Sequence, residues 1–207
     1  MKTAIRQGLM IRALALLALL VSGSAHAQQW YAIEVIVFAE SRSGGASDEI
    51  IRDVESGPPT GRGASLGPPA SSAQQPKAFQ RIATGDLQLG GALSKLRGSG
   101  RYRPLLHVGW YQPGYDRGNT RPVRLRARGG VIDGIVSVAR ERYLHLSADL
   151  LYSSGVRSRL KQRRRMRSRE LHYLEHPRFG MIVQATPFNG PTDGGSSVPP
   201  PVPTRVQ

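Results

Sequence analysis

Side chains that bind anions are concentrated in one short stretch of this 207-residue chain. Residues 163–177 hold five arginines, two histidines and two glutamates. A guanidinium group can bind a carboxylate or a phosphate through two parallel hydrogen bonds, so closely spaced arginines predict an acidic ligand. Which ligand it is depends on the compartment in which the chain works.

The same stretch also matches a zinc motif. His172-Tyr173-Leu174-Glu175-His176 has the H-x-x-E-H spacing of one group of metallopeptidases, which places both histidines on one face of a helix. Pro177 disfavours helix at His176, and the surrounding pattern is typical of a strand. In a strand the two histidines would lie roughly 13 Å apart, too far for one zinc ion. We therefore predict no metal, no cofactor and no catalytic residue, and a protein that is not an enzyme.

Residues 1–27 predict a secretory signal peptide. Three basic residues precede an apolar run at 13–21, and residues 25–27 read Ala-His-Ala, a cleavage pattern. The run is shorter than the roughly 20 residues that span a bilayer, and no later segment is apolar enough, so no membrane span is expected after cleavage. The chain contains no cysteine, which excludes disulfides and a lipidated N terminus. We expect a periplasmic protein that starts at Gln28.

The positive charge is unevenly distributed. The formal charge of the chain is +15, and residues 91–180 carry twenty lysines and arginines against six acids. Residues 28–90 carry five against seven. A field of this kind concentrates anionic polymers near the protein. Export excludes nucleic acid as the partner in vivo, and leaves the acidic polymers of the cell envelope.

The hydrophobic patterns predict one α+β domain over residues 28–188. Residues 30–38 form a nearly continuous apolar run, typical of a strand buried on both faces, with Glu34 as the exception. Apolar residues at 89, 92, 93 and 96 predict a helix between 87 and 97. Further strands are predicted at 104–112, 130–140, 142–152, 165–174 and 181–188. These elements give a mostly antiparallel sheet of about six strands with one packed helix.

Two segments are predicted to lie outside the packed core. Residues 41–78 are rich in glycine, proline, serine and alanine, which predicts a long flexible loop with one helical turn at 48–55. Residues 189–207 have a similar composition and predict a disordered tail.

A strand over 165–174 would make the arginines into a row. Arg165, Arg167 and Arg169 would share one face with Tyr173, at steps of roughly 7 Å. Such a row suits spaced carboxylates or phosphates. A solvated edge strand whose charges deter aggregation explains the pattern equally well, and the residue types leave both interpretations open. The predicted ligand-binding residues are Arg163, Arg165, Arg167, Arg169, His172 and Tyr173.

Six segments of the chain, taken in order, carry a family resemblance. They are Trp30–Phe38, Tyr102–Pro113, Tyr143–Leu146, Arg164–Ser168, Glu170–Tyr173 and His176–Gly180. Together they resemble the CsiV family, periplasmic peptidoglycan-binding proteins of Gram-negative bacteria. The resemblance covers residues 29–40 and about 100–188. It implies non-catalytic wall binding, a role in wall assembly and cell shape, and cooperation with an outer-membrane lipoprotein that activates a class A penicillin-binding protein. It supplies no binding residues.

Three functions follow from these observations. The first is a module that holds peptidoglycan through the carboxylates of its stem peptides, on a basic sheet face. The second is an adaptor that docks on another envelope protein, such as the lipoprotein activator, without binding the wall itself. The third is a wall amidase or peptidase, which nothing in the sequence favours.

Overall fold

The computed structural model describes residues 28–41, 57, 59, 61, 63–70 and 75–191. The predicted signal peptide, the predicted helical turn at 48–55 and residues 192–207 of the predicted tail lie outside the described residues. Within the described part of the chain, no helix has both the length and the apolar character needed to cross a membrane.

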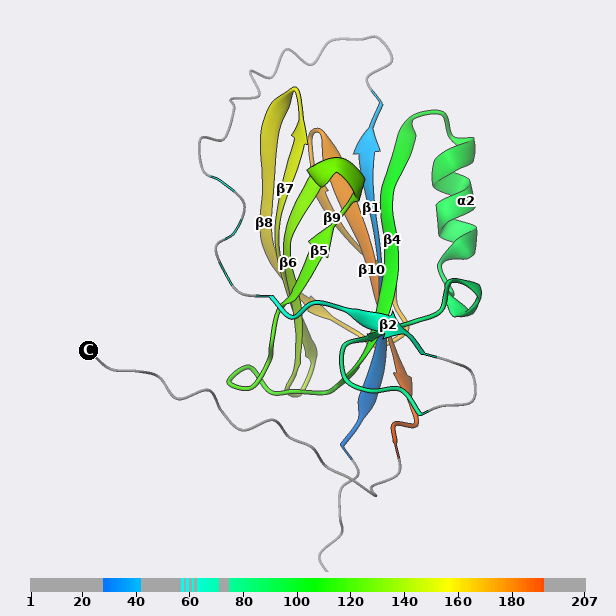
Figure 1. Cartoon of the computed structure of the whole chain (residues 1–207), viewed down its shortest axis with the longest axis vertical. Coiled ribbons are helices and arrows are strands. Elements are labelled where there is room, and N and C mark those ends of the chain that lie inside the picture. Colours follow the sequence, from blue (N-terminus) through cyan, green and yellow to red (C-terminus); the bar gives the residue numbers. More distant parts are fainter. Residues whose placement is uncertain are drawn as a thin grey trace, which may run out of the picture.

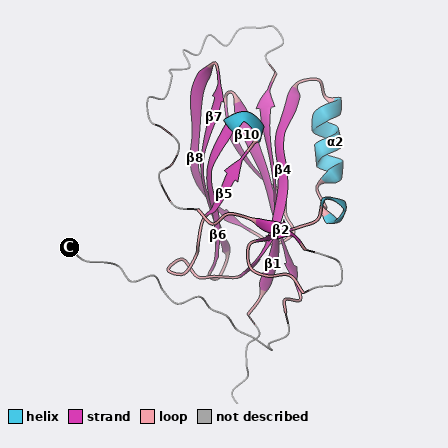
Figure 2. Cartoon of the chain, in the orientation of Figure 1, coloured by secondary structure: helices cyan, strands magenta, loops and turns pink. Residues whose placement is uncertain are grey.

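The described residues form ten strands in two sheets that pack against each other (Figure 1). In spatial order, the first sheet contains β2 (Gly67–Pro69), β3 (Gln80–Arg81), β4 (Tyr102–Pro113), β1 (Trp30–Glu40), β10 (Phe179–Phe188) and β9 (His172–His176). The second contains β5 (Val123–Arg126), β6 (Ile132–Arg140), β7 (Leu144–Ser154) and β8 (Val156–Met166). The helices are α2 (Gly90–Gly98) and two 3-10 turns, η1 (Thr84–Asp86) and η2 (Arg128–Gly130), as Figure 2 shows.

The main core lies between the two sheets. Alternate residues of β6 and β7 point into it, as their period-two patterns predict. The neighbouring strands β1 and β10 supply the opposite wall of this core. The inward residues of β6 and β7 are Ile132, Val136, Val138, Leu144, Leu146, Ala148 and Leu150, all at most 3% exposed.

β1 lies in the middle of the six-stranded sheet and is buried on both faces. Ile33 faces the main core, whereas Ile36 and Phe38 face α2 and pack against Leu89 and Leu96. The predicted doubly buried strand and the predicted helix with its apolar face are therefore confirmed. The molecule has three layers, with α2 on one face of the six-stranded sheet and the four-stranded sheet on the other (Figure 1).

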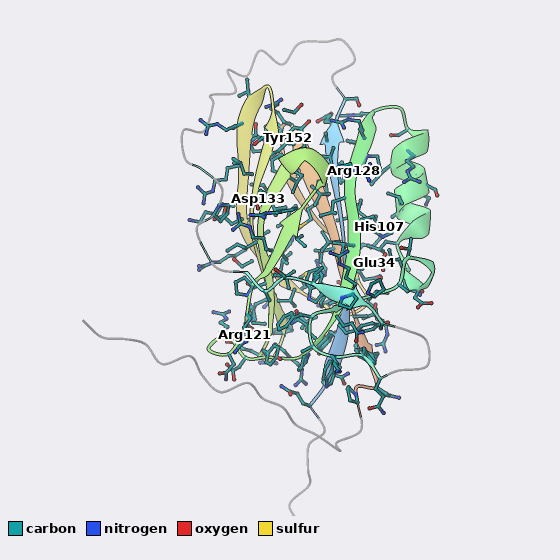
Figure 3. All side chains as sticks on the ribbon, viewed as in Figure 1. Glu34, His107, Arg121, Arg128, Asp133 and Tyr152 are labelled. Atoms are coloured by element: carbon teal, nitrogen blue, oxygen red, sulfur yellow. The ribbon has the colours of Figure 1, made fainter. Side chains whose placement is uncertain are left out.

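Glu34, the exception in the apolar run, ties α2 to the sheet. It is 4% exposed, and its carboxylate accepts hydrogen bonds from the backbone N–H groups of Gln88 (2.8 Å) and Leu89 (2.7 Å), just before the helix. His107 Nε2 lies 2.6 Å from the same carboxylate, beside Glu34 in Figure 3. The first N–H groups of a helix lack hydrogen-bond partners within the helix and carry partial positive charge. A buried carboxylate at this position accepts their hydrogen bonds and offsets that charge.

The sheet arrangement differs from the prediction. We expected one sheet of about six strands, whereas the described residues form two sheets. Sequence analysis missed the short strands β2, β3 and β5, of two to four residues each, and most of β8, which carries six cations in eleven residues. Those cations conceal an alternation in which Ser158, Leu160 and Met166 are buried.

The predicted strand over 165–174 is wrong. β8 ends at Met166 and β9 begins at His172, so a turn occupies the residues between them. Arg169 within this turn has a φ of 66°, a left-handed backbone that a continuous strand does not contain. The turn reverses the chain from the four-stranded sheet into the six-stranded sheet.

Part of the segment predicted as a loop, 41–78, pairs with both sheets. Its strand β2 runs parallel to β3 at the edge of the six-stranded sheet. Ala64 forms a parallel bridge with Val123, and its carbonyl accepts a hydrogen bond from Arg124 N at 3.0 Å. The described residues of this segment therefore connect the two sheets along one side.

Replacing Glu34 with glutamine is expected to lower the free energy of unfolding by about 1–3 kcal/mol, because a buried N–H group loses its charged acceptor. Urea unfolding followed by circular dichroism measures the change. Glu40→Gln is the matched control on the same strand, since Glu40 pairs with the exposed Arg101 (2.6 Å), and a smaller loss is expected there. Equal losses in the two variants would show that Glu34 does not anchor α2.

Candidate functional site

The outer face of the four-stranded sheet carries most of the candidate site. The strand register places arginines on both edge strands, β5 and β8, with two aspartates, two serines and four other side chains between them. We call this surface the basic face. Its members are Arg124, Arg126, Asp133, Ile135, Ser137, Ala139, His145, Ser147, Asp149, Leu151, Arg157, Arg159, Lys161, Arg163 and Arg165.

Two acids neutralise one end of the basic face. Asp133 accepts two hydrogen bonds from Arg124, both at 2.8 Å, and Arg126 Nε lies 3.3 Å from it. Asp149 accepts two from Arg159, at 2.7 and 2.8 Å. Paired contacts of this kind are the strong form of the arginine–carboxylate interaction. The arginines at this end are therefore engaged in holding the sheet together.

The pKa values follow from these pairs. Burial by itself would raise the pKa of Asp133, but the hydrogen bonds from Arg124 and Arg126 outweigh it and hold this pKa below the ordinary value of 3.8. The hydrogen bond to Asp149 raises the pKa of Arg159. Asp133, Arg124 and Arg159 are therefore charged at neutral pH.

The other end of the basic face differs. Lys161, Arg163 and Arg165 are exposed on the outer side of β8, at steps of roughly 7 Å. Within the described ranges none of them forms an ion pair. Asp149 stands opposite Lys161, but Arg159 bonds to both of its oxygens. We call Lys161, Arg163 and Arg165 the cation row.

Small side chains lie beside the cation row. Ser147 stands directly opposite Arg163, and Ser137 stands opposite Ser147 on the next strand. Ala139 occupies the neighbouring position of β6. A hydroxyl can donate a hydrogen bond to an anion, so Ser137 and Ser147 supply possible donors beside the cation row.

Aromatic contact orients Arg165. Its guanidinium lies over the Tyr143 ring, with 4.6 Å between Cζ and the ring centroid, and Arg142 lies 5.6 Å from the same ring. Stacking uses the face of a guanidinium and leaves its N–H groups, which point outward in its plane, available. Arg165 is therefore held in place without losing its donors.

His145 closes the end of the row. Arg117 Nη2 donates to His145 Nδ1 at 2.9 Å, and Glu141 lies 3.3 Å from His145 Nε2 and 3.0 Å from Arg117 Nε. Because a guanidinium can only donate, Nδ1 carries no proton in this arrangement. Arg117 and His145 are thus paired with each other and with an acid, unlike the three cations of the row.

Of the six predicted ligand-binding residues, the structure keeps only Arg163 and Arg165 together on the basic face. Arg167 lies in the turn, 3.6 Å from Glu170, and Arg169 uses its backbone N–H to bond Ala185 O at 2.9 Å. The expectation that Arg165, Arg167 and Arg169 share one strand face is therefore wrong, because the strand ends at Met166.

His172 and Tyr173 lie on β9 in the other sheet. His172 Nε2 accepts a hydrogen bond from Arg167 N at 3.2 Å and so closes the turn. Tyr173 stacks on Phe38 at 6.0 Å between ring centroids, beside Tyr102 on the helix-bearing face. Burial, followed by Glu175, raises the pKa of Tyr173 to about 12. The two residues therefore do not extend the cation row.

The inner side of β8 has a structural task. Arg164 donates to the carbonyl of Tyr173, and Gln162 Nε2 donates to the carbonyl of Glu175 at 2.9 Å. β8 and β9 form no backbone ladder, so these side chains, together with Arg178, which donates to Ser154 O, Val156 O and Ser158 Oγ, supply hydrogen bonds that join the two sheets along this side. The side chains on one face of β8 therefore join the two sheets, and those on its other face form the cation row.

Sequence reasoning missed Lys161, Ser137, Ser147 and Tyr143 as members of the site. A detectable signal existed for Lys161, since the buried positions 158, 160 and 166 share one parity and place residue 161 on the other face. The serines and Tyr143 carry no such signal, because the pairing of strands brings them to the row. The residues His172–His176, which match the zinc motif, form strand β9. They are not helical, and this was the reason for rejecting the zinc site.

The chain was also compared with known proteins. A family model described as "Peptidoglycan-binding protein, CsiV" matches residues 9–188. Searches of curated proteins and of solved structures gave no match. The matched range contains α2, both sheets and the whole basic face.

Asp133→Asn is expected to lower the free energy of unfolding by about 1–2 kcal/mol at neutral pH, because Arg124 loses a charged acceptor that is only 18% exposed. The pKa of Asp133 is lower in the folded state, so its stabilisation is complete above the unfolded pKa near 3.8. It is lost as the pH falls through the lower folded value. The difference between wild type and variant should therefore shrink in acid.

Urea unfolding at neutral pH and near pH 3 measures this difference. Glu170→Gln is the control, since Glu170 is 51% exposed and lies 3.6 Å from Arg167, and little change is expected at either pH. A difference for Asp133→Asn that is the same at both pH values would contradict the assignment.

Proposed function

Since the chain belongs to the CsiV family of peptidoglycan-binding proteins, we propose that it binds peptidoglycan in the periplasm through the basic face, without catalysis. In this role it supports cell-wall assembly and cell shape. The observation that carries the proposal is the cation row, three exposed cations that no acid neutralises within the described residues. Stem peptides of peptidoglycan carry free carboxylates, which are the matching anions.

Electrostatics favours this face. The acids of the four-stranded sheet, Asp133 and Asp149, are bonded to Arg124 and Arg159, so their oxygens are already engaged when a ligand meets the cation row. The surplus of basic residues over 91–180 also raises the local concentration of an acidic polymer. Each exposed contact contributes modestly, so binding would depend on several contacts made at once.

The test is co-sedimentation of the protein with purified sacculi over a salt series. Replacing Lys161, Arg163 and Arg165 together with glutamine is expected to weaken retention about tenfold or more, because up to three charge-assisted contacts are lost. Salt should weaken retention of the wild type more steeply than that of the variant.

The matched control replaces Lys95, Arg97 and Arg103 with glutamine. It removes one lysine and two exposed arginines on α2 and at the start of β4, and retention is expected to stay near wild type. Equal retention of the two triple variants would refute the basic face as the site. Failure of the wild type to sediment at low salt would refute wall binding itself.

A second candidate, an envelope adaptor that docks on another protein, is favoured by one observation. Leu171 is 57% and Tyr173 is 42% exposed. Tyr173 stacks on Phe38, and Phe38 also contacts Tyr102. Exposed apolar and aromatic side chains of this kind are typical of protein interfaces. The outer-membrane lipoprotein that activates a class A penicillin-binding protein is the partner to test.

If the protein is an adaptor, a photo-crosslinking side chain at position 171 should give one dominant protein adduct in cells, identified by mass spectrometry. The same side chain at position 95 on α2 serves as the control and should give none. An adduct from position 171 together with no retention on sacculi would favour the adaptor. Retention on sacculi without an adduct would favour wall binding.

A further inference from the structure

We propose that the cation row selects stem peptides bearing two free carboxylates roughly 7 Å apart, and discriminates against peptides in which one of them is amidated. This inference rests on the proposed function and specifies its ligand. The geometry points to it because Arg163 and Arg165 occupy successive outward positions of one strand, with Ser147 opposite Arg163 and the Tyr143 ring against Arg165.

The first of the two positions is built around Arg163. Ser147 stands opposite it on β7 and Ser137 beyond that on β6, both half-buried. A carboxylate here can take two N–H donors from the guanidinium and a further hydrogen bond from Ser147. The two serines opposite Arg163 are small, and their hydroxyl groups lie on the same face as the guanidinium.

The second position is built around Arg165. Stacking on Tyr143 fixes its guanidinium and leaves the N–H edge open to a second carboxylate. His145, opposite Arg165, is held by Arg117 and Glu141, so it does not bond to Arg165. Because strand positions two apart are separated by roughly 7 Å, the two carboxylates would have to be similarly spaced.

An amidated stem peptide would bind more weakly because of its hydrogen-bond donors as well as its lost charge. A carboxylate is an acceptor only, whereas a carboxamide presents an NH2 group with two donors. A guanidinium is a donor only, so one edge of the amide would face it donor against donor. A site built for an acceptor therefore rejects the amide more strongly than the loss of charge alone implies. Neutral glycan chains without stem peptides would lack both carboxylates.

The closing experiment titrates the purified protein with a soluble stem tetrapeptide that has free carboxylates, and with the same peptide amidated at one of them. Isothermal calorimetry measures the dissociation constants. We expect about tenfold weaker binding for the amidated peptide. Arg163→Gln and Arg165→Gln should each weaken binding of the free peptide and reduce the difference between the two peptides. Arg97→Gln is the matched control and should change neither constant.

Sacculi separate the failure of this inference from the failure of the proposed function. Intact sacculi should retain the protein, and free glycan chains, released by enzymatic removal of the stem peptides, should not displace it from them. Equal affinity for the free and the amidated peptide, or displacement of the protein from intact sacculi by free glycan chains, overturns the inference and leaves wall binding standing. Absence of retention on intact sacculi overturns both.

Discussion

The register between β7 and β8 is the constraint on which the binding surface depends. Leu160 and Met166 of β8 lie in the main core at 1% exposure, opposite leucines of β7. Side chains alternate along a strand, so burial of these two places the cation row outside. A shift by one residue would bury the three cations and expose the apolar side chains. Burying unpaired charges is far costlier than the stability of a domain allows, so the apolar side of β8 holds its charged side in place.

The distribution of acids, more than the number of arginines, decides which cations can meet a ligand. Asp133 and Asp149 bind arginines of β5 and β8 at one end of the basic face and stabilise the sheet there. Figure 3 places Asp133 on this sheet, across the molecule from Glu34 and His107. Glu34 is likewise committed, to the start of α2. The structural carboxylates are thus bonded to cations outside the cation row, although Asp149 stands opposite Lys161, and folding and binding use different cations of the same charged surface.

Elements with a strong apolar period were predictable, and elements defined by charge were not. The run at 30–38, the helix and the alternating strands β6 and β7 carry their own signal, and all lie where the patterns predicted. β8 carries six cations and only three buried side chains, so its period is hidden. The turn after Met166 depends on a left-handed Arg169, a conformation that its residue type does not announce. For this reason the row of cations lies within residues 161–165, whereas the predicted ligand-binding residues lie within 163–173. The serines beside the row come from β6 and β7, which only the fold brings next to it.

A flat row of exposed cations suits a repetitive polymer better than an enclosed pocket would. Exposed ion pairs are individually weak, and each is screened by salt. A polymer that presents carboxylates repeatedly gives a high effective concentration of sites, which favours rebinding after each dissociation. A sheet keeps the guanidiniums at a fixed spacing, with Arg165 stacked on Tyr143, so little side-chain freedom is lost on binding. Rigid spacing combined with weak single contacts therefore gives selectivity for the pattern of carboxylates and still allows the protein to leave any one position on the wall.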